Sequence, residues 1–506
     1  MVRWLHKMPC RERCMMDEFV TYEAFGAVGD GMNDDLPAIC SAHEHANSLG
    51  LPVRTKSDAT YHLGRRALTV IIGTDTDWNT SRFTIDDSSQ PEDHKKPLFE
   101  VRSLLKPEQL QIDQLRRDQD QIEARPEHDC HVMVENDTEK VFIRKGKNRN
   151  NGIPKSDCFI LRRDGSVEGP VDWDYDTFTR ISARPIDDTR LTLRGGIFTT
   201  IANRMKQDVG YNYWSRNILI TRSNTEIAGV SHYIAGETAV GHPYSGFLNI
   251  SQCANITLRD CFVTGHKTYS TIGVADEPVS MGSYDISVGR VVNFTMINCH
   301  MNHILDRSRW GVIGSNLCKN ILLQGCTLSR MDTHMGVSGT YTIRDCKLGY
   351  MGLNAIGRGI LSVEDSELYG NALVSFRSDY GSTWEGDLVI RNSRWVPSCG
   401  DTIWPHMIEV HNDGTHDFGY PCSMPRDVTI DGVVVDDTNH PDDYTGMFIF
   451  ADPSRETGDG SPPTEPPFPY SLCRRVKIRN LTTKTGKKWS LSPNREMANS
   501  KVVEEG

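Results

Sequence analysis

The chain has 506 residues and a formal net charge of −11, from 56 basic and 67 acidic residues. Because it has no long basic run, we expect neither a nucleic acid nor an anionic membrane surface as its main partner. No apolar stretch reaches the length of a membrane span or a signal peptide, and 14 cysteines are too few for a disulfide scaffold. We therefore expect a cytoplasmic protein with reduced, buried thiols.

The first distinctive segment reads FGAVGDGMNDDLPAI, residues 25–39. Its glycines are wrongly spaced for a dinucleotide-binding loop or a P-loop, and it lacks the ligand pattern of a calcium-binding EF-hand. A helix fits better, because Asn33 or Asp34 can cap it, Pro37 suits its first turn and Gly50 can end it.

Metal-binding patterns are weak in this sequence. Cys10 and Cys14 have a spacing that occurs in zinc sites, but no second Cys or His pair lies nearby. We expect no metal and no other cofactor.

Two further segments differ in composition from the rest of the chain. Residues 104–156 are highly charged and begin with a possible helix, which predicts an insertion or a small accessory lobe. Residues 451–470 are rich in Pro and Gly and are typical of a long surface loop.

The central part of the chain repeats one short template, seen in segments such as NITLRDC, NFTMINC, NILLQGC and TYTIRDC. Its alternating apolar residues indicate a strand with one buried face, and a spacing that falls to 20 residues is typical of a solenoid. The template ends on a small residue at Gly196, Ser223, Cys261, Cys299, Cys326, Cys346, Ser366 and Ser393. We predict an all-β solenoid, a single-stranded parallel β-helix, in which these cysteines stack about 4.8 Å apart as an internal ladder.

The segment YEAFGAVGDGMNDDLPAICSAHEHA, with a short strand around ATYHLG after it, resembles the start of the pectate-lyase-like superfamily. That superfamily includes polygalacturonases, related polysaccharide lyases and phage tailspikes. The resemblance implies a right-handed parallel β-helix whose first coil is covered by an N-terminal capping helix, which would protect an aggregation-prone edge. It also implies a carbohydrate partner, bound in a groove on the outside of the solenoid.

These features divide the chain into five parts. They are an extension (residues 1–20), an opening segment with the capping helix (21–70), early coils with a charged insertion at about 104–156 (71–190), main coils carrying the groove (191–485) and a polar tail (486–506).

The coils within residues 299–393 carry the polar residues best suited to a groove. Counted from the small residue of each coil, Asp306 and Asp332 fall at nearly the same place on neighbouring coils, about 5 Å apart. His334 and Asn354 are expected to stack in the same way.

The same coils resemble the active-site coils of polygalacturonases, with departures. MDTHMGVSG takes the place of the Asp-Asp motif, with Asp332 as the second Asp and Met331 instead of the first. GLNAIGRG takes the place of the Gly-His-Gly motif, with Asn354 where the His would be, and ALVSFRSDYG keeps Arg377 but loses the Lys of Arg-Ile-Lys. The preceding Asn-Thr-Asp motif has no Asp here unless Asp306 replaces it, so the resemblance argues against a pectin hydrolase.

We predict a glycoside hydrolase that uses a pair of carboxylates. Asp332 would be the general acid, tuned by His334, and Asp306 or Asp379 would be the second carboxylate. Arg377 would bind a substrate hydroxyl or carboxylate. The other candidate substrate-binding residues are Asn354, Arg307, Arg309, Trp310, Tyr380, Trp384 and Glu385.

Two alternatives stay open, as does the oligomeric state. The first is a polysaccharide lyase acting by β-elimination, for which a second polar cluster could supply the base: His242, Tyr244, His266, Lys267 and Tyr269. The second is a carbohydrate-binding solenoid of the tailspike type without enzymatic activity.

Overall fold

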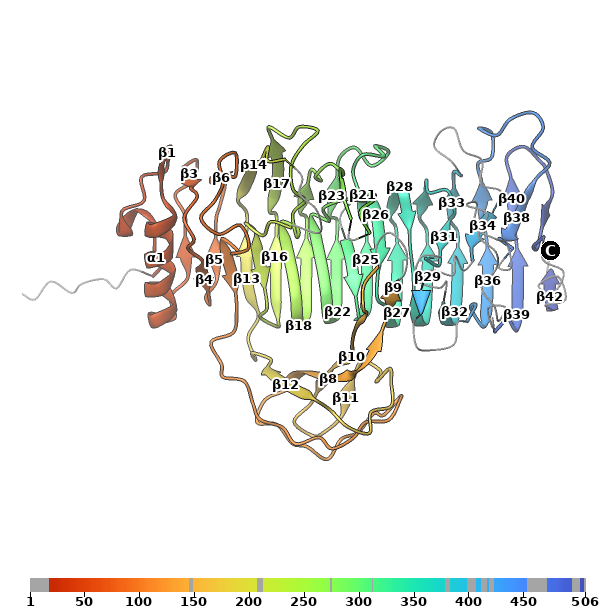
Figure 1. Ribbon diagram of the computed structural model, residues 1–506, viewed down its shortest axis with the longest axis horizontal. Helices are drawn as coiled ribbons and strands as arrows, with labels where there is room; N and C mark the ends of the chain where they lie inside the picture. The colour runs from red at the N-terminus through yellow and green to blue at the C-terminus, as the bar shows by residue number, and fades with distance from the viewer. Residues whose placement is uncertain are drawn as a thin grey trace, which may run out of the picture.

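The computed structural model describes residues 18–144, 149–206, 213–273, 275–311, 313–377, 383–397, 406–410, 416–417, 423–452, 471–493 and 501–504. The chain winds into a long stack of short coils, whose strands lie side by side along the molecule (Figure 1). Thirty strands form one sheet, and the pairing between successive coils is parallel. The predicted right-handed parallel β-helix is confirmed.

The stack begins with α1 (Leu36–Leu49), which lies at its N-terminal end (Figure 1). The helix starts after Asp35, one residue later than the predicted cap Asp34 and two later than Asn33, and ends at Gly50, whose amide donates to the carbonyl of Ala46. One face of α1 packs into the core of the first coils. No helix in the described part of the chain is long and apolar enough to span a membrane.

The cysteine ladder predicted inside the stack is confirmed. Cys326 and Cys346 are both buried, and the amide of Cys326 donates to Sγ of Cys346 at 3.4 Å. The amide of Cys346 donates in turn to Oγ of Ser366 at 3.0 Å. The ten cysteines within the described residues form no disulfide.

One predicted member of the ladder, Ser223, is wrong, and Val230 takes its place. The amide of Ser231 bonds to the carbonyl of Gly196, and the amide of Phe262 bonds to that of Val230. The segment before Ser223 forms β15 (Ile218–Ile220), which pairs with the first half of β18 (Leu248–Arg259) in a different face of the solenoid. Both faces use the same apolar alternation, so the sequence pattern did not separate them.

The charged insertion is a lobe beside the stack, drawn below it in Figure 1. It holds a four-stranded antiparallel sheet in the order β11-β10-β8-β12, formed by β8 (Cys130–Val141), β10 (Ile153–Leu161), β11 (Val167–Glu168) and β12 (Arg180–Pro185). The insertion therefore reaches beyond residue 156, and its first part, residues 104–129, contains no helix, contrary to expectation.

The lobe is fixed to the stack by a buried ion pair. Lys319, on β25 (Cys318–Gln324), is 1% exposed, and its Nζ lies 2.6 Å from Oδ1 of Asp157 and 3.4 Å from Oδ2 of Asp172. Burial opposes the charge of the amine, but the two carboxylates raise the pKa of Lys319 above its usual value. Beside this pair, Met133 and Ile160 of the lobe pack on the stack.

The stack continues past the predicted start of the polar tail. Within the tail, β41 (Trp489–Ser490) pairs with β38 (Met447–Phe450), and β42 (Lys501–Glu504) pairs with β39 (Arg475–Arg479). The predicted surface loop lies, from residue 453 to 470, outside the described residues.

Candidate active site

Asp332 lies on β26 (Thr327–Thr333), directly beside Gly314 of the preceding coil. Side chains alternate along a strand, and Met331 packs in the core of the solenoid, so Asp332 points to the outside. Its exposure is nevertheless 0%, because four side chains cover it. They are Tyr284, Arg330, His334 and Arg377, and together with Asp332 we name them the Asp332 cluster.

The carboxylate of Asp332 is held by two arginines. Nη1 of Arg377 lies 2.5 Å from Oδ1, and Nη2 of Arg330 lies 3.0 Å from Oδ2. Burial alone would raise the pKa of Asp332, but Arg330, Arg377 and His334 hold it well below its usual range. An ionised, fully covered carboxylate does not suit a general acid, so the geometry argues against the role predicted for Asp332.

His334 and Tyr284 form the part of the cluster that can move a proton. Nε2 of His334 lies 2.8 Å from Oδ2 of Asp332 and 3.0 Å from the hydroxyl of Tyr284, which itself donates to Oδ2. An ionised carboxylate only accepts, so the hydrogen of the neutral imidazole belongs on Nε2 and the basic nitrogen is Nδ1. The side chain of His334 is 25% exposed.

The pKa shifts of these two groups are opposite in sense and complementary. Burial lowers the pKa of His334 in spite of the neighbouring Asp332, so the imidazole is neutral near pH 7. Burial also raises the pKa of Tyr284 well above its usual range, so the phenol keeps its proton. A neutral imidazole and a protonated phenol thus both bond to Oδ2 of Asp332, and the basic nitrogen of His334, Nδ1, is not part of this contact.

Trp310, which is predicted to bind substrate, borders the cluster. The guanidinium of Arg330 lies 5.6 Å from the centre of its ring, and the ring of Tyr284 lies 6.0 Å away. The indole packs directly on Gly282, where a Cβ would come within 2.4 Å of it, so glycine makes room for the ring.

Asp306 does not stack beside Asp332, contrary to the prediction, because Gly314 occupies that position. The coil from Cys299 to Cys326 is 27 residues long, against 20 for the next coil, and its extra residues form an exposed loop that contains Asp306. Oδ1 of Asp306 accepts hydrogen bonds from the amide and the hydroxyl of Ser308, each at 2.8 Å, which is the usual role of Asp in a turn.

Asn354 stacks beside Asp332 and not beside His334, also contrary to the prediction. The pairs Arg330–Gly352 and Met331–Leu353 fix this register, and an irregularity between Leu328 and Arg330 produces the shift.

Trp384 is a core residue, so the prediction that it binds substrate is wrong. Its exposure is 0%, and its ring stacks with Phe376 at 6.4 Å. The guanidinium of Arg307 lies 4.2 Å from the ring of Tyr350, and Nη1 of Arg309 lies 3.9 Å from Oε2 of Glu237.

Of the three remaining predicted residues, Glu385 alone falls within the described part of the chain. Glu385 is paired with Arg117 of the lobe at 2.7 Å. Asp379 and Tyr380 lie outside the described residues.

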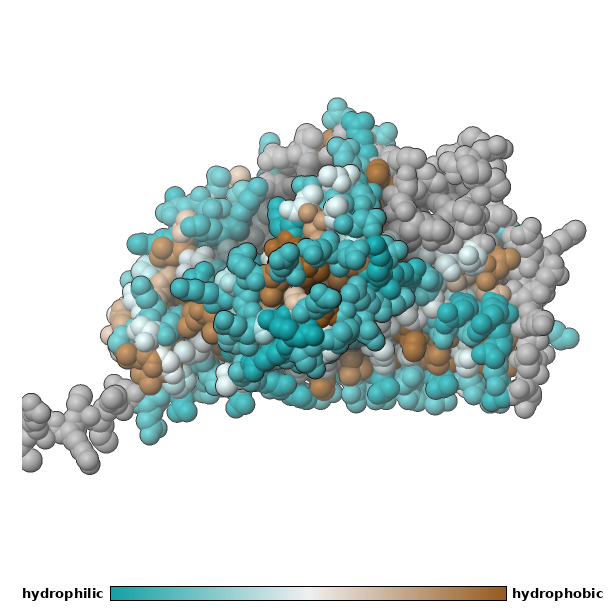
Figure 2. All heavy atoms as spheres, turned by 90° about the horizontal axis from the view of Figure 1, so that it is seen from below, coloured by the Kyte–Doolittle hydropathy of each residue, from teal (hydrophilic) through white to brown (hydrophobic). Residues whose placement is uncertain are grey.

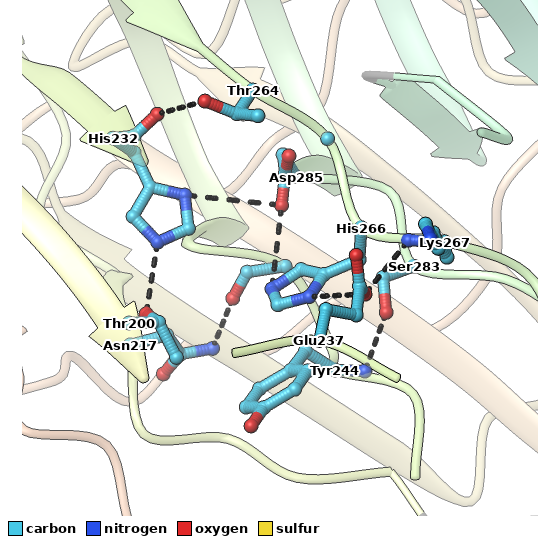
Figure 3. Close-up of polar contacts among 12 residues, drawn as sticks. Thr200, Asn217, His232, Glu237, Tyr244, Thr264, His266, Lys267, Ser283 and Asp285 are labelled. Carbon is cyan, nitrogen blue, oxygen red and sulfur yellow. Dashed lines mark hydrogen bonds and ion pairs between the residues drawn. The ribbon is translucent and has the colours of Figure 1, made fainter. Parts of the chain in front are cut away.

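The second polar cluster forms around His266 (Figure 3), and its aromatic rings are buried. Nδ1 of His266 lies 3.3 Å from Glu237, which also accepts from the hydroxyl of Tyr269 at 2.8 Å, and Nε2 lies 3.8 Å from Asp285. Tyr244 stacks on the imidazole at 4.3 Å. His242 is stacked on Trp214, and Lys267 joins through its backbone amide. Since these rings are buried, a polymer cannot reach them.

Sequence reasoning missed Tyr284 and Arg330 in the first cluster, and Glu237 and Asp285 in the second. Arg330 could have been found, because it precedes Asp332 by two residues on one strand and so shares its face. Tyr284 could not, since it comes from a coil whose register depends on a loop of irregular length. No group of three or more His, Cys, Asp or Glu among the described residues is arranged to hold a metal ion.

Comparison with known proteins places the fold among phage tailspikes. No protein-family model matches the chain. The tailspike gp61 of Pseudomonas phage phi297 matches with a TM-score of 0.51 and 11% identity, over 96% of this chain and 84% of that one. The tailspike gp49 of Pseudomonas phage LKA1 matches with a TM-score of 0.51 and 13% identity, over 91% and 81%. At this identity the likeness shows the fold alone.

One curated relative is similar in sequence over a short stretch. A capsule depolymerase of Klebsiella phage P510, specific for capsule KL64, is 31% identical over 94 residues. The match covers 16% of this chain and 9% of that protein.

Proposed function

We propose that this protein binds and cleaves a polysaccharide at the Asp332 cluster, on the outside of the β-helix. The observation that carries the proposal is the pair formed by the neutral His334 and the protonated Tyr284, whose Nε2 and hydroxyl lie 3.0 Å apart and both bond to one buried carboxylate. The short match to a capsule depolymerase supports a polysaccharide as the substrate class.

The charge of the cluster favours an acidic sugar. Arg330 and Arg377 carry two positive charges against the single negative charge of Asp332, and both guanidinium side chains keep 10% exposure. The arginine fork can hold a substrate carboxylate through two hydrogen bonds. We therefore expect a uronic acid or another carboxylated unit at the cleavage point.

β-Elimination is the chemistry that the described residues support best. His334 would take the hydrogen from the carbon next to the sugar carboxylate, while Arg330 and Arg377 stabilise the negative charge that develops there. The electron pair of that C–H bond forms a C=C bond, the bond to the glycosidic oxygen breaks, and Tyr284 gives its proton to the departing oxygen.

Hydrolysis is the second candidate. It needs two carboxylates, one of them protonated, and Asp332 is ionised and fully covered. Asp379 follows Arg377 by two residues, which favours it as the additional carboxylate of a hydrolase site.

A screen against purified bacterial capsular polysaccharides, with and without uronic acids, tests the proposal. New ultraviolet absorbance together with new reducing ends indicates elimination, while reducing ends without that absorbance indicate hydrolysis. If no polysaccharide is shortened or bound, the proposal is wrong.

A single substitution then tests the site. His334→Ala is expected to lower the cleavage rate about 100-fold or more, the usual contribution of a positioned base. His300→Ala, at an exposed histidine of β23 (His300–Met301), is the matched control and should keep full activity. Full activity of the His334 variant would contradict the assignment.

A further inference from the structure

A cleft separates the lobe from the stack close to the Asp332 cluster. Its volume is ≈ 340 Å³, within the range of about 300–1,000 Å³ typical of ligand pockets. Trp173 comes from the lobe, while Met335, Gly336 and Ser338 come from the stack, at the start of β27 (Val337–Arg344). Figure 2 shows the molecule from the lobe side, as a largely hydrophilic face with hydrophobic residues gathered near its centre.

The four charged residues that line this cleft, two basic and two acidic, sum to zero. Arg117 of the lobe lies 2.7 Å from Glu385 of the stack. Arg358 of the stack lies 3.4 Å from Asp172 and 2.5 Å from Asp118, both of the lobe. The side chains of Glu385 and Arg117 remain 57% and 38% exposed, so both can still bond to a ligand.

Part of the cleft lining is apolar. Trp173 is half-buried and packs on the core of the lobe, while Phe142 and Met335 belong to a small apolar cluster at the contact between lobe and stack. An aromatic ring next to hydroxyl-binding charged groups matches the two kinds of surface of a pyranose ring, which has apolar C–H faces and a polar edge.

We infer that this cleft is a second carbohydrate-binding site, which takes an uncharged pyranose unit with Trp173 against one face of the ring. The charge balance distinguishes it from the Asp332 cluster, whose excess positive charge favours an acidic unit. Guanidinium groups and carboxylates in pairs offer both donors and acceptors, as the hydroxyls of a neutral sugar require.

The two sites are close enough for one polysaccharide chain to occupy both. Gly336, at the cleft, follows His334 by two residues, so their Cα atoms are at most about 7 Å apart. As a second site for the same polysaccharide, the cleft rests on the proposed function, and the lobe would select the neighbour of the unit that is cleaved.

Fluorine NMR of the protein labelled with 5-fluorotryptophan tests the inference without a known substrate. The resonance of Trp173 is identified by its loss in Trp173→Phe. The probes are the methyl glycosides of glucose, galactose and glucuronic acid, each titrated to about 100 mM. We expect the Trp173 resonance to shift saturably with a neutral glycoside, and that of the core residue Trp78, which is 0% exposed, to stay unchanged.

A matched pair of variants adds a second readout. Glu385→Gln should weaken the binding of the neutral glycoside several-fold, while Glu364→Gln, on the same face of the stack but outside the cleft, should not. No shift of Trp173 with either neutral glycoside, or a shift with the glucuronide alone, would overturn the inference.

The two proposals can fail separately. A sugar response at Trp173 in a protein that cleaves no polysaccharide would keep the cleft and overturn the cleavage site. Polysaccharide cleavage without any response at Trp173 would keep the cleavage site and overturn the cleft as a binding site.

Discussion

Asp332 and Asp285 are both 0% exposed, yet burial has opposite outcomes for them. Asp332 contacts two guanidinium groups and an imidazole, and its pKa is well below the usual range. Among the described residues neither oxygen of Asp285 has a hydrogen-bond partner, and burial raises its pKa to about 6. The partners of a buried carboxylate, more than its depth, therefore decide its charge.

Asp285 makes the stability of the protein depend on pH. A raised pKa means that the folded state binds the proton more tightly, so this contribution is complete below pH 3.8 and is lost as the pH rises through about 6. Above pH 6 the folded protein bears the free-energy cost of an ionised, buried Asp285. That cost is about 3 kcal/mol, from the difference of about two pKa units between the folded and unfolded states, and Asp285→Asn removes it.

We expect Asp285→Asn to raise Tm by about 3 to 6 °C at pH 8, and the gain to vanish near pH 4. Calorimetry across this pH range measures it, with Asp365→Asn at an exposed residue as the control for the loss of one charge. An equal shift of Tm at every pH would contradict the raised pKa.

At the scale of the element, close stacking of the coils depends on glycine where two backbones meet. Gly357 opens β29 (Gly357–Glu364) at φ 139°, and a Cβ there would lie 2.0 Å from the carbonyl oxygen of Val337. Gly336 has a similar backbone, with φ 99°, but its Cβ would meet nothing within 4 Å.

Comparison of alanine substitutions at these two glycines distinguishes a steric clash from backbone strain. Gly357→Ala is expected to lower the free energy of unfolding by about 1–3 kcal/mol more than Gly336→Ala, because only the first pushes two coils apart. Urea denaturation of both variants measures the difference. Equal losses would mean that the positive φ, and not the contact between coils, requires glycine.

The same elements show which parts of the structure could be predicted from the sequence alone. The ladder through Cys261, Cys299, Cys326 and Cys346 was predictable because each strand keeps one template. The stacking of Asp306 on Asp332 was not, because side chains on neighbouring coils align only if the loops between them are counted correctly. Most of the fold could therefore be predicted from the sequence. The candidate site could not, because its geometry depends on a strand register that loops and bulges determine.

For the whole molecule, the joint between lobe and stack depends on Lys319. The lobe supplies Asp157 and Asp172 to this buried amine, and all three groups are removed from solvent to a large extent. Removal of one partner from a buried ion pair leaves an uncompensated charge and costs about 3–5 kcal/mol.

We expect Lys319→Ala to release the lobe before the stack unfolds, and hydrogen exchange of β8 and β10 to rise while that of β22 (Ile286–Ile297) stays slow. Arg163→Ala, which breaks an exposed pair with Asp188 in the lobe, is the control and should cost about 0–1 kcal/mol. Unchanged exchange in the lobe of the Lys319 variant would show that apolar contacts alone hold it.

The Lys319–Asp157 pair also sets an order of events during synthesis. Its two residues are 162 positions apart. At a synthesis rate of about 5–20 residues per second, Lys319 is therefore added roughly 8 to 30 seconds after Asp157. Until then the carboxylates of the lobe remain hydrated and its docking face is uncovered. The lobe can settle only after β25 has joined the growing stack, so the cleft, which needs residues of both, can form only after that point.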